Sequence, residues 1–417
     1  MFKTFTNKLF LQTIVIIIPI SVLISDYVAS KLETFGQSPF ATHMTIFLFL
    51  YALYISYKNR KYLNCRETRY VLLFFLLSIP AYFMSVFTSL ESYIRFFALI
   101  SYVPLGFMCG LSWGRQFNVV EDKIKDSTVF LLMIPATLAS YMIASSTFVS
   151  LYNENEDYSR DYVFGIVLFL PLLLYFKKRF WPIIFMIIAS CICVISAKRT
   201  GIVCVAVIVF FFIAIKVGAK RIKYSKVITT LFLSLLVMFL AYRATPDISP
   251  QMEIAVERFE NLNDESNEAR WGKYERISSE IGQANFFTLL FGHGCLASIQ
   301  KLGSPTHNDL LEITYDYGFL PLTCIIFLFF SLLFRVFRGK KIDLYSSLVL
   351  LSTLIILFLT TMGNCMFTNH IFVFVLLFTL GFALSNLRAH GSNKVYCQDI
   401  LSIIYGQIFQ NSNQKVV

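Results

Sequence analysis

Long apolar runs dominate this chain and leave few folds open to it. Windows long enough to cross a bilayer recur about twelve times along the sequence. They fall near residues 9–25, 39–57, 70–90, 93–112, 127–150, 162–176, 181–196, 201–216, 227–242, 318–335, 342–361 and 368–387. The runs are continuous rather than alternating, and lipid permits only helices or closed barrels to span it. The sequence therefore predicts an all-α polytopic membrane protein with about twelve transmembrane helices.

The composition agrees with this prediction and argues against a soluble protein. Hydrophobic residues make up 57% of the chain and charged residues only 15%. A net charge of +11 could suggest nucleic-acid binding, but the basic residues cluster in short stretches between apolar spans. Such clustering is a topology signal, so no nucleic-acid partner is predicted. The nine cysteines include no CxxC pair, and neither a disulfide framework nor a metal site is expected.

The basic stretches predict the orientation of the chain. They occupy alternate connections: 58–69, 115–125, 177–179, 216–226 and 335–341. Short cytoplasmic loops carry an excess of Lys and Arg, so this side is predicted to be cytoplasmic, together with both termini. The connections on the other side are sparse or acidic, as in residues 153–161.

These patterns divide the chain into four segments. Residues 1–242 are predicted to form nine transmembrane helices, and 307–387 three more, followed by a cytoplasmic tail at 388–417. The long external loop between them, 243–306, carries amphipathic stretches that we expect to form short helices at the membrane surface. They lie at Met252–Leu262 and Arg270–Leu290. Loops of this length in compact proteins are usually lids or binding elements.

His307 is the leading candidate for chemistry. Ser304-Pro305 is typical of a helix start, so His307 is expected in the first turn of a helix that enters the membrane. Histidine suits general-base work because its unperturbed pKa lies near neutrality. The alternative is an interfacial histidine that only hydrogen-bonds a carbonyl.

The helix predicted after Ser304 would have two distinct faces that carry polar residues. One face would join His307 to Leu311, Thr314 and Gly318, and another would carry Asp309, Glu312 and Asp316.

Lys198 and Arg199 form a second candidate group. They lie in a very short external turn, where positive charge opposes the orientation bias. A phosphate or pyrophosphate would offset the cost, because a guanidinium matches phosphate oxygens. Snorkelling to lipid headgroups is the competing explanation.

Two further arginines have both a functional and a structural interpretation. Arg270 begins a stretch in the external loop in which Lys273 and Arg276 follow at three-residue spacing. Trp271 and Tyr274 lie between them, which suits an anionic sugar-bearing lipid or a plain interfacial helix. Arg95 lies one turn inside the fourth span after Glu91, and it is either a buried cation or a partner of that glutamate.

The segment around His307 resembles a known signature. His307-Asn308, nine residues and then Gly318-Phe319-Leu320-Pro321 resemble the pattern shared by bacterial O-antigen polymerases and O-antigen ligases. In that pattern His and Asn precede a spacer of nine residues and a Gly-x-x-Gly-like end, from which Pro321 departs. Three further features fit the family: the turn 196–201, Gly292-His293-Gly294, and Arg270.

The resemblance implies a metal-independent membrane glycosyltransferase without a cofactor. It would act on undecaprenyl-pyrophosphate-linked glycans at the periplasmic face of the inner membrane of a Gram-negative bacterium. His307 would deprotonate or orient the acceptor hydroxyl, while Lys198, Arg199 and Arg270 would bind the pyrophosphate. We also expect Asn308, Asp309 and Glu312 to bind substrate. A chain-length regulator and a flippase are the partners that the family implies.

Several functions remain open at this point. The polymerase is favoured over the ligase, which transfers the finished glycan to lipid A core, because residues 308–318 and the Gly-His-Gly turn look polymerase-like. A polysaccharide flippase would also have about twelve spans, but transporters usually show repeats and charges at the midplane. Here the polar residues gather near the external surface. A structural protein of a polysaccharide complex is the last alternative.

Overall fold

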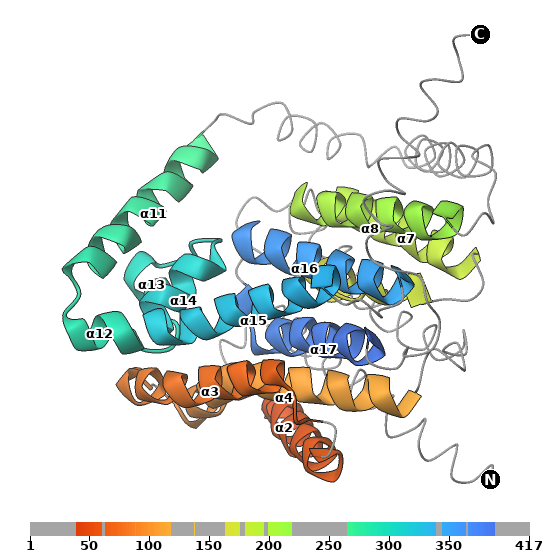
Figure 1. The fold of residues 1–417 in the computed structure, drawn as a ribbon. Coiled ribbons are helices and arrows are strands. Elements are labelled where there is room, and N and C mark those ends of the chain that lie inside the picture. The colour runs from red at the N-terminus through yellow and green to blue at the C-terminus, as the bar shows by residue number, and fades with distance from the viewer. Residues whose placement is uncertain are drawn as a thin grey trace.

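The computed structural model describes the chain in ten segments. They are residues 39–60, 63–87, 89–117, 137, 163–175, 180–195, 199–218, 265–338, 344–363 and 366–387. Every regular element in these segments is a helix (Figure 1). The predicted spans at 9–25 and 227–242, most of 127–150, the stretch 252–262 and the tail 388–417 lie outside the described residues.

Five of the described helices are long and apolar enough to cross a membrane. They are α3 (Arg66–Met84), α4 (Leu90–Phe117), α15 (Phe319–Arg338), α16 (Leu344–Gly363) and α17 (His370–Leu387). The prediction of a helical chain with several apolar helices of membrane-spanning length is confirmed, and the count of about twelve spans stays a prediction. Three further helices accompany them: α2 (Pro39–Lys58), α7 (Phe180–Ile195) and α8 (Arg199–Gly218).

The span predicted at 162–176 is not one continuous α-helix. The structure has the short helix α6 (Phe164–Val167) followed by the 3₁₀ segment η3 (Leu170–Tyr175). Pro171 lies inside η3 and has no backbone N–H to donate, which interrupts the hydrogen-bond ladder that the apolar pattern alone would predict.

The helices pack in layers, and the polar elements gather at one end. α16 lies between α8 and α17, α17 runs along α4, and α15 runs along α3 (Figure 1). The helices α11 (Glu265–Gln283), α12 (Phe286–Phe291), α13 (Ala297–Leu302) and α14 (Asp309–Tyr317) group at the end where α15 begins. We call this the α14 end. Helices were predicted within 270–290, and α11 and α12 confirm them with a break at Ala284 and Asn285.

A glycine seam brings α4 and α17 into backbone contact. Gly106, Gly110 and Gly114 recur every four residues and therefore share one face of α4. A Cβ atom on Gly106 or Gly110 would collide with the backbone of Phe374 or Phe378 respectively. Contacts advance in the same direction along both helices, so α4 and α17 are parallel. Small residues at such spacing let membrane helices approach closely, and the sequence analysis overlooked them.

We expect Gly110→Val to destabilise the protein, because the added side chain must push α17 away. The free energy of unfolding should fall by about 3 kcal/mol or more. Thermal unfolding of the full chain in detergent, followed by size-exclusion fluorescence, measures this. Gly272→Ala is the matched control, since a Cβ there meets nothing within 4 Å. An unchanged melting temperature for Gly110→Val would contradict a role for the seam.

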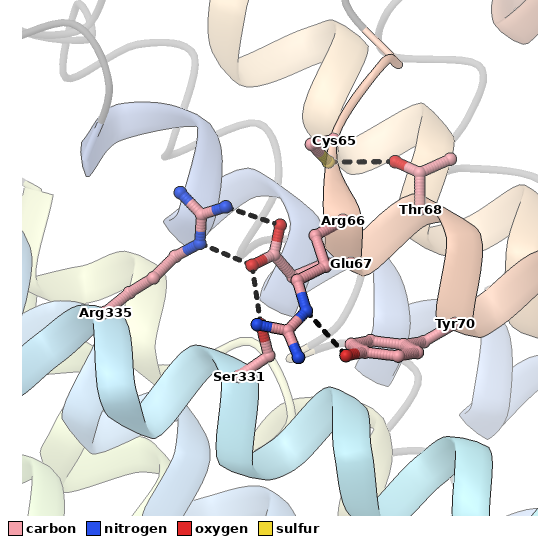
Figure 2. Close-up of polar contacts among 7 residues, drawn as sticks. All are labelled: Cys65, Arg66, Glu67, Thr68, Tyr70, Ser331 and Arg335. Carbon is pink, nitrogen blue, oxygen red and sulfur yellow. Dashed lines mark hydrogen bonds and ion pairs between the residues drawn. The ribbon is translucent and has the colours of Figure 1, made fainter.

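A buried ion pair joins α3 to α15 at the opposite end of the bundle (Figure 2). The Glu67 side chain is fully buried, and Arg335 donates to both of its carboxylate oxygens, from Nε and from Nη2, the latter at 2.9 Å. Ser331 donates a further hydrogen bond at 2.9 Å. A buried carboxylate costs several kcal/mol unless it is paired in this way. Arg335 was counted among loop cations, but the structure places it within α15.

Removing the Glu67 carboxylate should destabilise the protein because the Arg335 guanidinium then loses its partner inside the bundle. Glu67→Ala is expected to lower the free energy of unfolding by about 3 kcal/mol. This is the lower end of the range for breaking a buried ion pair, because the Arg335 side chain is 32% exposed. Arg66→Ala is the control, since Arg66 is exposed and bonds Tyr70 on the helix surface. Equal melting temperatures for the two variants would show that the pair does not stabilise the fold.

Candidate functional site

α14 begins one residue after Asn308 rather than at the predicted start. The Asn308 side chain accepts hydrogen bonds from the backbone N–H groups of Leu310 (3.1 Å) and Leu311 (3.3 Å), which is N-cap geometry. The helix start predicted at Ser304-Pro305 is therefore wrong, because the asparagine cap fixes the first turn at Asp309. His307 precedes the helix and does not belong to one of its faces.

α14 also ends earlier than predicted, at Tyr317. Gly318 follows with φ 89°, and Gly292 at the end of α12 has φ 82°, both in the left-handed region that favours glycine. A Cβ on either glycine would collide with the backbone of the opposite segment, at Leu290 or at Asp316. The predicted helix face joining His307 to Gly318 does not exist. The end of α14 and the end of α12 approach so closely that the chain must leave the helix at Gly318.

His307 itself has a strained backbone. Its φ of 62° is uncommon for a residue with a Cβ, and it is one of only two such residues in the described part of the chain. The side chain is half-buried. A conformation of this kind costs on the order of 1–3 kcal/mol and persists where the surroundings impose it.

Glu312 imposes part of that conformation from within α14. Its side chain is 1% exposed. One carboxylate oxygen accepts from the Thr306 backbone N–H at 2.6 Å and from the Thr306 hydroxyl at 2.8 Å. The residue before His307 is thus tied back to the helix that follows it.

Lys273 holds the same loop from α11. Its ammonium group donates to the Ser304 hydroxyl at 2.6 Å and to the Pro305 carbonyl at 3.3 Å. α11 is also joined to α13 by the Lys301–Glu280 pair at 2.9 Å, although exposed pairs of this kind contribute little to stability. Lys273 was not among the predicted site residues. In the sequence, only its position one turn after Arg270, in a basic and aromatic stretch, suggested a role for Lys273.

Asp309 connects α14 to the start of α17. Its fully buried carboxylate accepts from the backbone N–H groups of Met366 (3.0 Å) and Phe367 (2.9 Å). Both donors belong to η5 (Met366–Thr368), the short 3₁₀ segment before α17. Asp309 and Glu312 therefore support the fold around His307, and substrate binding by either of them stays a prediction.

The third carboxylate of α14, Asp316, holds the turn after α12. It accepts from the Ser298 backbone N–H at 2.7 Å and lies 3.1 Å from the Ser298 hydroxyl. Burial raises the pKa of the Asp316 carboxyl well above its usual range, although the Ser298 N–H opposes this shift. His293 of the Gly-His-Gly turn stacks on Tyr315 with ring centroids 4.1 Å apart.

The predicted cations are described only in part. Arg270 lies on α11 with its side chain exposed, three residues before Lys273. Arg199 is the first residue of α8, and only its backbone is described, while Lys198 lies outside the described residues. Thr200, the second residue of α8, lies against Gly363 at the end of α16. The backbone at Arg199 and the His307 loop are thus both tied to the segment that precedes α17.

The described residues contain no group of three or more His, Cys, Asp or Glu side chains that could hold a metal ion. Comparison of the sequence with models of known protein families and with curated proteins finds no match.

Lys273→Met should loosen the His307 loop while leaving the bundle intact, because only the two hydrogen bonds to Ser304 and Pro305 are lost. We expect amide hydrogen exchange of a peptide covering residues 303–308 to accelerate by about tenfold, in line with roughly 1–2 kcal/mol of lost local stability. Mass spectrometry of the full chain in detergent measures the exchange. Arg276→Met removes an exposed charge from the same helix and should leave it unchanged. Identical exchange in both variants would show that Lys273 does not hold the loop.

Proposed function

We propose that this protein is an O-antigen polymerase that joins undecaprenyl-pyrophosphate-linked repeat units. The observation that carries the proposal is the His307-Asn308 signature, combined with the way the surrounding residues hold His307. A strained, half-buried histidine at the end of an apolar bundle is costly unless it has a task. Backbone strain of this kind clusters at functional sites.

The proposed orientation follows from the charge pattern of the sequence. About twelve helices would span the inner membrane, with the basic connections and both termini in the cytoplasm. The α14 end, with the long loop 243–306, would then face the periplasm. Both lipid-linked substrates would reach His307 from the bilayer. We also propose that the protein works with a flippase and a chain-length regulator.

The proposed reaction is a block transfer between two lipid-linked glycans. His307 accepts the proton of a hydroxyl on the non-reducing end of the acceptor glycan, and that oxygen attacks the anomeric carbon of the donor. The bond between the anomeric carbon and the pyrophosphate oxygen breaks, and undecaprenyl pyrophosphate leaves. Arg199, Arg270 and Lys198 would stabilise the charge that grows on the leaving group. No divalent metal is required in this scheme.

The bonds described around His307 support its assignment as general base. A base must be held within hydrogen-bonding reach of the proton that it takes. Glu312, Lys273 and the Asn308 cap restrict the loop on both sides of His307. Positioning of this kind reduces the entropy that the reaction must otherwise lose.

His307→Ala should abolish polymer formation. We expect a silver-stained lipopolysaccharide gel of a deletion strain to show single repeat units on the core and no ladder. A plasmid with the wild-type gene should restore the ladder, whereas His307→Ala should yield at least about 100-fold less long-chain product, the usual contribution of a general base. His43→Ala, an exposed histidine on α2, is the control and should restore the ladder. Immunoblots of membranes must show equal amounts of each variant.

The same gel separates the alternatives. Bare core, with polymer retained on the undecaprenyl carrier, would identify a ligase. Bare core with single units held at the cytoplasmic face would identify a flippase. Long chains made by His307→Ala would exclude the role given to this histidine.

A further inference from the structure

A buried polar cluster lies where α2, α4 and α17 meet. His370 is the first residue of α17 and is 5% exposed. Its Nε2 atom lies 3.3 Å from the Thr45 hydroxyl of α2. The Tyr102 hydroxyl of α4 donates to the Thr45 carbonyl at 2.6 Å, and the Tyr102 and His370 rings lie 5.8 Å apart. The cluster thus joins three helices within the apolar bundle.

Arg95 adds a positive charge to this cluster. It precedes Tyr102 by seven residues, two helical turns on the same face of α4, and it lies within electrostatic range of His370. Its Nε atom is buried and has no hydrogen-bond partner among the described residues. The buried Nδ1 atom of His370 also finds no hydrogen-bond partner there. Ionisable groups inside a membrane span are costly and usually mark a function.

An apolar groove of about 270 Å³ lies beside the cluster, between α2, α3 and α4. Its lining residues are Thr45, Ile46, Phe49, Tyr82, Tyr93, Ile94, Phe97 and Ala98. Thr45 links the groove to His370, and Ala98 lies one turn from Arg95. Tyr93 and Ile46 are 45% and 39% exposed, so the groove opens on the outer surface of the bundle.

We propose that this groove seats one acyl chain of an anionic phospholipid whose phosphate binds Arg95. The charge is complementary, because the phosphate would pair with the guanidinium of Arg95, a residue that is partly exposed. An apolar peptide helix would fill the groove but leave the Arg95 charge without a partner.

A resident phospholipid fits the groove better than a reacting substrate. All of its lining residues come from α2, α3 and α4, and none belongs to the segment 265–318 that positions His307. The bound lipid would brace α2 against α4 beside the start of α17. η5, which precedes α17, donates two backbone hydrogen bonds to Asp309. By stabilising the start of α17, the lipid would also support the His307 loop. This inference is independent of the proposed reaction.

Native mass spectrometry of the full chain tests the proposal. The protein is released from bilayers of phosphatidylcholine that contain phosphatidylglycerol as the anionic probe. We expect the wild type to retain one phosphatidylglycerol, and Arg95→Met to retain about tenfold less, as the loss of a charge-assisted hydrogen bond predicts. Arg95→Lys keeps the charge and should retain an intermediate amount. Arg276→Met, an exposed cation of α11, should match the wild type.

Equal retention by the wild type and Arg95→Met would overturn the proposal. So would displacement of phosphatidylglycerol by added undecaprenyl pyrophosphate, since the carrier lipid would then be the occupant. A photoreactive benzophenone amino acid at Phe97 locates the lipid directly. Crosslinks to phosphatidylglycerol are expected, whereas crosslinks to residues 9–25 would show that the chain itself covers the groove. Size-exclusion profiles establish that each variant is folded before these comparisons are made.

Discussion

Polar groups buried inside a bundle of apolar helices have no water to bind, and this constraint explains the main contacts of the structure. Arg335 and Ser331 supply hydrogen bonds that allow the Glu67 carboxylate to be buried. Asp309 and Asp316 are buried because backbone N–H groups of η5 and of α13 reach them. Each of these pairings joins elements that are distant in the sequence. The same groups that would otherwise oppose burial therefore determine which helices lie together.

The three carboxylates of α14 illustrate how this constraint shapes the candidate site. Asp309 faces η5, Glu312 faces the loop before His307, and Asp316 faces the turn after α12. One short helix thus connects every segment around His307. The histidine can adopt a left-handed backbone because these contacts, together with Lys273, hold the residues before and after it. Strain at one residue is offset by bonds at its neighbours.

Hydrophobic patterning predicts the long helices correctly, whereas a helix start that depends on local geometry is misplaced. α15, α16 and α17 lie within a few residues of the windows expected for them. The start of α14 was misplaced because Ser304-Pro305 and Asn308 are both plausible caps, and only the contact of Thr306 with Glu312 selects between them. The sequence grouped Lys273 with the cations Arg270 and Arg276, but its contact with Ser304 and Pro305 could not be predicted because they are about thirty positions away.

By itself, the sequence determined that the chain is helical, that it carries long apolar spans and that a histidine-bearing polar segment precedes one of them. The tertiary structure decided which helices touch, through the glycine seam of α4 and α17 and the pair of Glu67 with Arg335. It also decided that His307 lies before a helix rather than on one. The physical reason is that hydrophobic periodicity reports how a segment meets lipid, whereas contacts between segments depend on shape and on polar partners supplied by other parts of the chain.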